Sequence, residues 1–371
     1  MAGNGNIDFF CLECYTDKSE VNTLQTEVIK IDRENMDLDA LKRAGEILKS
    51  GGLVAFPTET VYGLGGDGLH EESSRKIYEA KGRPSDNPLI VHVADMEHLE
   101  KIVKKVPKAA YKLAEAFWPG PMTMILEKND LGPYGTTGGL DTVAIRMPSD
   151  PIARERIRQG GGYIAAPSAN TSGRPSPTTA QHVYEDLQGK IPMILDGGAV
   201  TIGLESTIVD LTEEIPTILR PGFISLDMVQ AVLGEAQIDR GLIANDSNIH
   251  PKAPGMKYRH YAPKADLKIV EGPMEQGISY INWQAEKGRT GIICTEETRS
   301  RYPKGEIKCV GTRKDELSIA SHLFAVLREF DEDGVEQIYS ESCKAPGLGE
   351  AIMNRLLKAA GHQKVDVSDR K

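Results

Sequence analysis

The stretch Leu53-Val54-Ala55-Phe56-Pro57 is a short apolar run that ends at a proline. An apolar run of this length predicts a buried strand, and proline ends it because its nitrogen cannot donate to a sheet. The residues before it predict a helix that ends at Ser50-Gly51-Gly52, with apolar side chains at helical spacing: Leu38, Leu41, Ala44, Gly45 and Leu48. A helix followed by a short buried strand is typical of α/β proteins.

The same alternation continues along the chain. We expect strands at residues 27–31, 88–93, 122–126, 143–146, 163–166, 193–195, 206–210 and 218–220, and helices at 73–81, 107–117, 150–158 and 226–233. Between Gly234 and Pro263 the periodicity is lost and prolines accumulate, which predicts a linker. A second α/β unit follows, with strands at 267–270, 291–295 and 337–340 and helices around 274–287, 319–331 and 349–360. The predicted parts are an N-terminal extension (1–30), a first domain (31–234), the linker (235–263) and a second domain (264–371).

Composition excludes several classes of protein. The 371 residues carry 44 Lys+Arg against 54 Asp+Glu, and the net charge of −10 disfavours a protein that coats nucleic acid indiscriminately. No apolar run approaches the ~18 residues of a membrane span, and the N-terminus lacks the basic region of a secretory signal. Five cysteines do not suggest a disulfide framework, so we expect a reducing compartment, the cytoplasm. Cys11 and Cys14 form a single CxxC. We interpret it as incidental, with a metal or redox site as the alternative, because no second pair lies nearby and the next histidine is His70.

Two glycine patterns suggest nucleotide binding, but neither has the right context. Gly63, Gly65 and Gly68 fit G-x-G-x-x-G, yet residues 57–62 separate this loop from the preceding strand, whereas a dinucleotide site needs the glycines at the strand end. Gly198 and Gly203 have Walker A spacing, but Leu204 follows where lysine is required. A nucleotide would therefore have to bind by another route.

The segment Lys81-Gly82-Arg83-Pro84 places two cations one residue apart at the end of a predicted helix. If the segment is extended, as Pro84 favours for Arg83, both side chains face one groove and suit a phosphate. A solvated basic helix end explains the same residues equally well.

Polar residues follow several predicted strands. Ser168 and Asn170 come after residues 163–166 and would present a hydroxyl and an amide to one ligand, although a capped turn is the simpler explanation. Arg146 and Arg220 end apolar strands, and Ser206 begins another. A buried arginine needs an anionic partner, either a carboxylate side chain or a bound anion. The three strand termini, which offer Arg146, Ser206 and Arg220, favour the bound anion.

Taken together, these segments resemble the threonylcarbamoyl-AMP synthases of the YrdC type, in their longer two-domain form. The resemblance rests on motifs such as Lys81-x-Arg83-Pro84 and Pro167-Ser168-Ala169-Asn170. It extends over residues 56–64, 81–92, 118–123, 166–173, 206–210, 220–222, 254–263 and 347–355. The fold it implies is a twisted, mostly parallel open sheet with a large concave site, followed by a smaller Rossmann-like α/β domain.

The resemblance implies an ATP-dependent nucleotidyltransferase that joins L-threonine and bicarbonate (or CO2) to AMP and releases pyrophosphate. A downstream complex would then transfer the threonylcarbamoyl group to tRNA. The reaction needs no protein nucleophile, in keeping with the lack of a convincing Ser-His-Asp or Cys-His set. We expect catalysis to come from alignment of two anions and neutralisation of charge, with Mg²⁺ held by the phosphates and no metal ligand from the protein.

The resemblance also assigns residues. Those matched to catalysis are Lys81, Arg83, Ser168 and Asn170. Those matched to ATP are Lys81, Arg83, Asn87, Thr142, Asn170, Ser176 and Arg220. Those matched to threonine are Thr58, His92, Arg146, Ser168 and Ser206. His92 alone, in an apolar strand, would be interpreted as a core residue.

The linker sequence Tyr258-Arg259-His260-Tyr261 predicts a lid, with Tyr258 and Tyr261 over the ATP site, although a passive spacer is the alternative. Two other functions compete with the synthase. One is a module that binds double-stranded RNA or tRNA through the same basic residues, weakly and without catalysis. The other is a carbamoyl-phosphate-dependent maturation enzyme, whose acylphosphatase-like and zinc-finger segments we do not find in this sequence.

Overall fold

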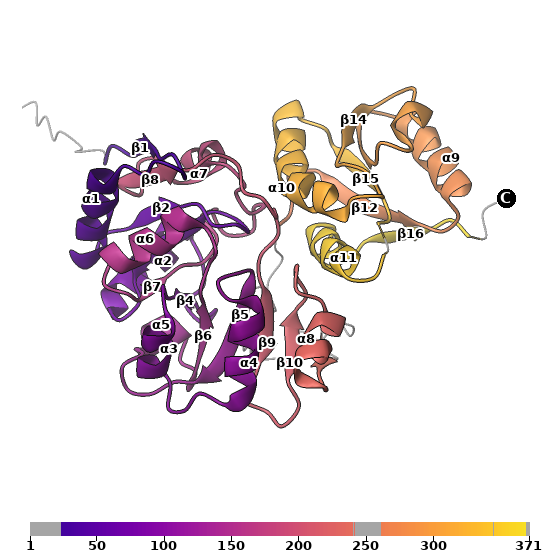
Figure 1. Ribbon diagram of the computed structural model, residues 1–371. Helices are drawn as coiled ribbons and strands as arrows, with labels where there is room; N and C mark the ends of the chain where they lie inside the picture. The colour runs from indigo at the N-terminus through magenta and orange to yellow at the C-terminus, as the bar shows by residue number, and fades with distance from the viewer. Residues whose placement is uncertain (1–23, 240, 242–260, 344, 369–371) are drawn as a thin grey trace, which may run out of the picture.

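The computed structural model describes residues 24–239, 241, 261–343 and 345–368. Figure 1 shows two bodies side by side, a larger one that ends near α8 and a smaller one that begins near β12. Each body is a sheet with helices packed on it, so the predicted α/β class is confirmed. Within the described part of the chain, no helix combines the length and apolar character that a membrane span requires.

The first sheet contains eleven of the described strands. In order across the sheet they are β1 (Glu27–Lys30), β8 (Met193–Asp196), β2 (Val54–Phe56), β3 (Gly63–Asp67), β7 (Ile164–Ala165), β4 (Ile90–His92), β6 (Thr142–Arg146), β5 (Met122–Glu127), β9 (Thr207–Asp210), β10 (Thr217–Arg220) and β11 (Gln237–Ile238). Five neighbouring pairs are parallel and five antiparallel. The sheet is therefore mixed, not mostly parallel as expected. Short connections such as residues 57–62 explain this, because they can join only antiparallel neighbours.

Strand β3 corrects the interpretation of residues 63–68 as a glycine-rich loop. It pairs antiparallel with β2 on one side and with β7 on the other. A Cβ added to Gly65 would lie 2.9 Å from Nη1 of Arg156 and 3.0 Å from Cε1 of Phe56. The glycines are therefore needed for close packing inside the sheet, and their low strand propensity hid the strand.

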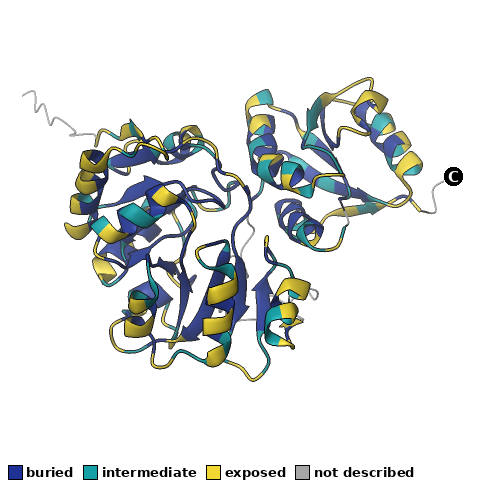
Figure 2. Ribbon diagram, in the orientation of Figure 1, coloured by how far each residue is buried: buried dark blue, intermediate teal, exposed yellow. Residues whose placement is uncertain are grey.

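Helices cover both faces of the sheet around β2. They are α1 (Leu38–Lys49), α2 (Glu71–Lys81), α6 (Pro151–Gln159) and α7 (Ala180–Leu187). Val54 and Phe56 pack with α1 and α6, whereas Leu53 and Ala55 pack with α2 and α7. Burial on both faces explains the continuous apolar run of β2. In Figure 2 these strands are dark blue and the outer sides of the helices are exposed.

The strands from β4 to β10 are covered differently. One face packs against α3 (Met96–Ile102), α4 (Lys108–Phe117) and α8 (Leu226–Leu233). The other face carries a cluster of five buried residues, to which no described helix contributes: Ile90, Ile125, Ala144, Ile208 and Leu219. Because Ile90 also lines a cavity, this face forms the floor of a hollow in the first domain. The short helix α5 (Tyr134–Thr137) lies against α2.

The first sheet extends into the segment that we interpreted as linker, because β11 pairs with β10. Residues 242–260, which include most of the expected lid, lie outside the described residues, as do Cys11 and Cys14 of the CxxC.

The second sheet is entirely parallel, with five described strands. Their order is β14 (Glu306–Cys309), β13 (Thr290–Cys294), β15 (Gln337–Glu341), β12 (Asp266–Glu271) and β16 (Lys364–Asp366). Helix α9 (Met274–Ala285) packs on one face, and α10 (Glu316–Asp333) and α11 (Leu348–Ala359) on the other, while a 3-10 turn, η2, spans Arg299–Arg301. This three-layer arrangement is Rossmann-like, as expected, although its order, 3-2-4-1-5, differs from the 3-2-1-4-5 of dinucleotide-binding domains.

The two domains share a core. Val61, Leu204 and Tyr261 belong to the same buried cluster as the apolar residues of α10 and α11. At Gly203 the backbones are so close that an added Cβ would lie 2.4 Å from Cα of Ser321 in α10. The second domain therefore packs directly against the segments that flank the hollow of the first.

Candidate active site

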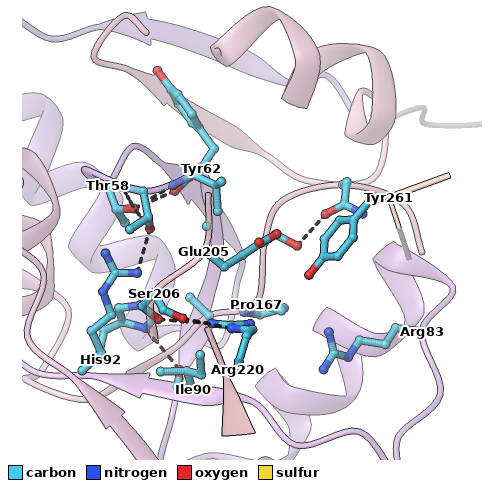
Figure 3. A pocket seen from close by; sticks show the side chains of 17 residues that line it. Thr58, Tyr62, Arg83, Ile90, His92, Pro167, Glu205, Ser206, Arg220 and Tyr261 are labelled. Carbon is cyan, nitrogen blue, oxygen red and sulfur yellow. Dashed lines mark hydrogen bonds between the residues drawn. The ribbon is translucent and has the colours of Figure 1, made fainter. Parts of the chain in front are cut away.

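One enclosed cavity gathers most of the residues that the sequence singled out. Nine of the fourteen predicted site residues line it: Thr58, Arg83, His92, Arg146, Ser168, Asn170, Ser206, Arg220 and Tyr261. Figure 3 shows Thr58 and His92 on one side of this cavity and Arg83 and Tyr261 on the other. Its volume is about 60 Å³. On the same scale a single water molecule needs ~10–15 Å³. The cavity therefore has room for a ligand the size of a small amino acid.

Strand directions explain why three of the polar side chains meet. Arg146 is the last residue of β6 and Arg220 the last of β10, whereas Ser206 directly precedes β9. Both β6 and β10 run antiparallel to β9, so the ends of the first two and the start of the third share one edge. The sequence placed these residues at strand termini, and the topology brings them together.

Arg146 is 4% exposed and is held by the turn that follows β2. Its Nη2 donates to Oε1 of Glu59 at 2.6 Å, and its Nη1 donates to Oγ1 of Thr60 at 2.9 Å. Of the two partners that the sequence left open for Arg146, a carboxylate side chain and a bound anion, Glu59 supplies the first. Its Nε is nevertheless buried with no hydrogen-bond partner among the described residues, so Arg146 retains a donor.

His92 ends β4 and is buried in the cavity wall. Burial, together with the charges of Arg146 and Arg156, holds its pKa well below the usual value, so the ring is neutral at physiological pH. Its Nδ1 lies 3.2 Å from the carbonyl oxygen of Ile90, and its ring meets Phe56 edge-on at 6.2 Å. A neutral imidazole can bind a polar ligand without adding a charge.

Ser206 and Arg220 form a second polar group. The Nε of Arg220 donates to the carbonyl oxygen of Ser206 at 2.9 Å, and its Nη2 donates to Oγ of Ser206 at 3.1 Å. That hydroxyl also lies 2.8 Å from Oγ1 of Thr123. No carboxylate is among the described hydrogen-bond partners of Arg220, although Glu205 is close enough to affect its pKa. Burial lowers that pKa to about 10, which leaves the guanidinium charged at neutral pH.

Ser168 and Asn170 point to the same side, as the sequence suggested. Oγ of Ser168 donates to Oδ1 of Asn170 at 2.6 Å, and both residues line the cavity. Lys81 lies behind them, and its Nζ donates to their two carbonyl oxygens. Lys81 is buried, and burial together with nearby Arg83 lowers its pKa well below the usual value.

Lys81 and Arg83 do not lie on an extended segment, so the predicted geometry was wrong. Gly82 ends α2 with φ +61°, and the amide of Arg83 donates to the carbonyl oxygen of Tyr78 at 2.9 Å. This left-handed cap turns Lys81 toward the Ser168–Asn170 loop and Arg83 toward the cavity. The signal was present in the sequence, since glycine after a helix commonly adopts such a cap.

Arg83 also lines a second, wider cleft of about 860 Å³. Tyr78, Tyr134 and Gly139 lie on its other sides. Nη2 of Arg83 donates to the carbonyl oxygens of Asn87 and Pro88, both at 3.1 Å. Arg83 therefore lines both the cavity and the wider cleft.

The other described residues that the sequence predicted do not line this cavity. Asn87 is buried beside Arg83, and its Oδ1 has no hydrogen-bond partner among the described residues. Thr142 begins β6, three residues after Gly139 of the wide cleft. Ser176 is fully buried and donates to Glu205 at 2.5 Å. Tyr258 lies outside the described residues.

Comparison with known proteins identifies the family. The model of the Sua5, YciO and YrdC proteins, described as "Telomere recombination", matches residues 46–222. The model described as "Threonylcarbamoyl-AMP synthase, C-terminal domain" matches residues 224–361. A threonylcarbamoyl-AMP synthase of Pyrococcus abyssi is 46% identical over 90% of this chain and 98% of its own length. The chain belongs to the threonylcarbamoyl-AMP synthase family.

Two further matches support the assignment to this synthase family. A threonylcarbamoyl-AMP synthase of Bacillus subtilis is 48% identical over 86% of this chain and 93% of its own length. A crystal structure of Sua5 from P. abyssi, complexed with L-threonine, has a TM-score of 0.86 at 45% identity and covers 92% of this chain and 99% of that one. The predicted fold and two-domain form are thus those of the synthase family.

Sequence reasoning missed two carboxylates at this candidate site. Glu59 pairs with Arg146, as described above. Glu205 lines the cavity, and its Oε2 accepts from Nε of Arg355, in α11 of the second domain, at 2.7 Å. Burial opposes ionisation of Glu205, but Arg355 and Arg220 outweigh it and lower the pKa to about 2. The motif at residues 347–355 contained Arg355, but nothing local in it indicates a partner 150 positions away.

The described side chains at this candidate site do not form a metal centre. Among the described residues, no three His, Cys, Asp or Glu side chains gather closely enough to hold a metal ion. Glu59 and Glu205 are each paired with an arginine. Mg²⁺ prefers several oxygen ligands and commonly binds through substrate phosphates. The residues present therefore fit an ion that arrives with ATP, not one that the protein binds by itself.

Proposed function

We propose that the enclosed cavity and the adjoining cleft form one site, where L-threonine, bicarbonate or CO2 and ATP react to give threonylcarbamoyl-AMP and pyrophosphate. The observation that carries this proposal is the group of three arginines, Arg83, Arg146 and Arg220, around one cavity of amino-acid size. An anionic amino acid derivative and a polyphosphate need such a concentration of positive charge.

Threonine fits the part of the cavity near β2, β4 and β6. Arg146 can bind its carboxylate, since its Nε has no other partner among the described residues, while Ser206 offers a hydroxyl group and His92 a neutral ring. Thr58 also lines the cavity, with its Oγ1 donating to the carbonyl oxygen of Val61 at 2.7 Å. The relative from P. abyssi whose structure contains L-threonine supports this choice of substrate.

ATP fits the side of Arg83. The triphosphate would lie against Arg83 and Arg220, and the nucleoside would extend into the 860 Å³ cleft toward Asn87 and Thr142. Lys81 fixes the loop of Ser168 and Asn170 from behind, and a bound phosphate would favour its charged form. Ser176 would act through Glu205, because the two are hydrogen-bonded.

The chemistry then requires alignment more than acid–base catalysis. The neutral amine of threonine adds to CO2 and releases one proton to solvent, which gives a carbamate anion. A carbamate oxygen then attacks the α-phosphorus of ATP. The new O–P bond forms as the bond to the leaving pyrophosphate breaks. The arginines neutralise charge at both anions, and Mg²⁺ bound to the phosphates would add to this. The product is a mixed anhydride and therefore a reactive acyl donor; by its resemblance to the family, the acceptor would be tRNA, reached through a separate transferase.

Burial of the basic residues argues against the alternative of an RNA-binding module. Lys81, Arg146 and Arg220 are 3–5% exposed. An RNA backbone cannot reach such side chains, whereas a small anion inside the cavity can.

The test is incubation of the protein with ATP, bicarbonate and labelled threonine. We expect pyrophosphate release that depends on threonine, together with a labelled AMP adduct. Arg83→Ala should lower the rate at least ~100-fold, as expected for loss of a preorganised charge at the phosphates. Arg43→Ala, which removes an exposed pair between α1 and Glu27, should leave the rate unchanged. Pyrophosphate release that needs no threonine, or that Arg83→Ala does not affect, would contradict the proposal.

A further inference from the structure

Arg355 is a residue of the second domain that reaches the cavity wall of the first. It lies in α11 and is fully buried. Its Nε donates to Oε2 of Glu205 at 2.7 Å, and its Nη2 is 3.3 Å from the carbonyl oxygen of the same residue. Its Nη1 donates to Oδ1 of Asn354 at 2.9 Å, which helps to fix the guanidinium plane. Arg355 therefore binds both the side chain and the backbone of Glu205.

The carboxylate of Glu205 lies near two guanidinium groups, those of Arg355 and Arg220. It lines the cavity and directly precedes Ser206, to which Arg220 is hydrogen-bonded. Glu205 and Arg220 are near enough for each to affect the ionisation of the other. Nevertheless, the described partners of the Glu205 side chain are Arg355 and Ser176, not Arg220.

We propose that Arg355 is a positioning residue that holds Glu205 away from Arg220 and so leaves the charge of Arg220 available to the triphosphate. Without Arg355, the buried carboxylate of Glu205 would remain near two cations whose pKa values it affects, Arg220 and Lys358, and we expect it to pair with the guanidinium of Arg220, which stays charged. That pair would neutralise the ATP side of the cavity. The inference rests on the proposed function and gives the second domain a part in it, since only a docked second domain places Arg355 at Glu205.

A second pair between the domains provides a matched comparison. Arg328 of α10 is 2% exposed and binds both carboxylate oxygens of Asp186, at 3.0 and 3.1 Å, and the carbonyl oxygen of Pro175. Neither Asp186 nor Pro175 lines the cavity. Arg328 thus resembles Arg355 in its burial and in its type of partner, but neither of its partners lines the cavity.

The experiment compares Arg355→Gln, Arg328→Gln and the double variant Arg355→Gln with Glu205→Gln in the full-length protein. We expect Arg355→Gln to raise both KM and the calorimetric Kd for ATP at least ~tenfold, with a change of less than about threefold in KM for threonine. The double variant should return both ATP constants to within about threefold of wild type, because the neutral amide that replaces the Glu205 carboxylate cannot capture Arg220. Arg328→Gln should lower Tm but keep the ATP constants within about twofold.

Each outcome decides the inference. If Arg355 merely attaches the domains, the double variant will bind ATP as poorly as Arg355→Gln or worse, and the proposal is overturned. Equal ATP affinity in Arg355→Gln and wild type would also overturn it. If Arg355→Gln fails to fold, Arg355→Met, which also removes the charge, replaces it, with the same expected rescue by Glu205→Gln. Calorimetry measures ATP binding without turnover, so absence of product from the wild type would count against the synthase assignment and not against the role of Arg355.

Discussion

The two walls of the cavity are held in different ways. On the threonine side, Arg146 is paired with Glu59, and both residues belong to the first domain. On the opposite side, Glu205 is held by Arg355, and the ring of Tyr261 stacks on Phe324 of α10 with a centroid distance of 5.0 Å. The first wall is complete within its own domain, whereas the second depends on the docking of another. We therefore infer that amino-acid binding and nucleotide binding have different structural requirements.

The largest effect should come from the self-contained wall. Arg146→Ala would leave Glu59 as an uncompensated buried charge, which typically costs about 3–5 kcal/mol of unfolding free energy. It should also abolish threonine binding. Urea denaturation and calorimetry with threonine measure the two effects. Arg43→Ala, in an exposed pair, is the control and should cost no more than about 1 kcal/mol. If both variants are equally stable, the Arg146–Glu59 pair does not hold this wall.

Acid should weaken the wall that depends on the second domain. Glu205 has a pKa of about 2 in the folded chain, against an ordinary value of 4.5. A lowered pKa gives stabilisation that is fully present above the ordinary value and is lost as the pH falls toward the folded value. The difference in unfolding free energy between wild type and Glu205→Gln should therefore be constant above about pH 5, at up to about 3 kcal/mol.

That difference should shrink steadily below the ordinary pKa of 4.5. Chemical denaturation at a series of pH values, with Glu275→Gln as a control in an exposed pair, measures it. A pH-independent difference between wild type and Glu205→Gln down to about pH 2 would mean that the pair with Arg355 does not require the ionised carboxylate.

The contrast between the walls also explains what the sequence could predict. Strands such as β2 and β6 are apolar runs closed by a proline or an arginine, so their positions and the strand-end location of Arg146 followed from local pattern. The family resemblance supplied the roles of Thr58 and His92, which local pattern alone does not distinguish from core residues. These residues belong to the wall that the first domain builds by itself.

The features that could not be predicted depend on packing between distant segments. Strand β3 was missed because its glycines are required by close neighbours, not by strand propensity. Gly82 turned Lys81 and Arg83 apart through a left-handed cap. The pair of Arg355 with Glu205 joins two domains, and no spacing rule connects residues so far apart in the chain. The sequence therefore predicted several residues of the second wall, such as Arg220 and Tyr261, but not the contacts between domains that hold it.

We expect the smallest effect from Tyr261→Phe. This variant tests whether the ring or the hydroxyl of Tyr261 stabilises the second wall. Tyr261 has φ +64°, the amide of its neighbour Ala262 donates to the carbonyl oxygen of Gly173 at 2.9 Å, and burial raises the pKa of Tyr261 to about 12. The hydroxyl is thus protonated at neutral pH. If packing against Phe324 holds the residue, Tyr261→Phe should cost about 1 kcal/mol or less and change KM for ATP less than about threefold.

Thermal unfolding and steady-state kinetics test this, with Phe324→Leu as the companion that weakens the stack and keeps the hydroxyl. Phe324→Leu should then be the more damaging of the two variants. The reverse order would mean that the hydroxyl, not the ring, holds this wall. In that case the second domain would contribute polar contacts as well as Arg355 to the nucleotide side of the cavity.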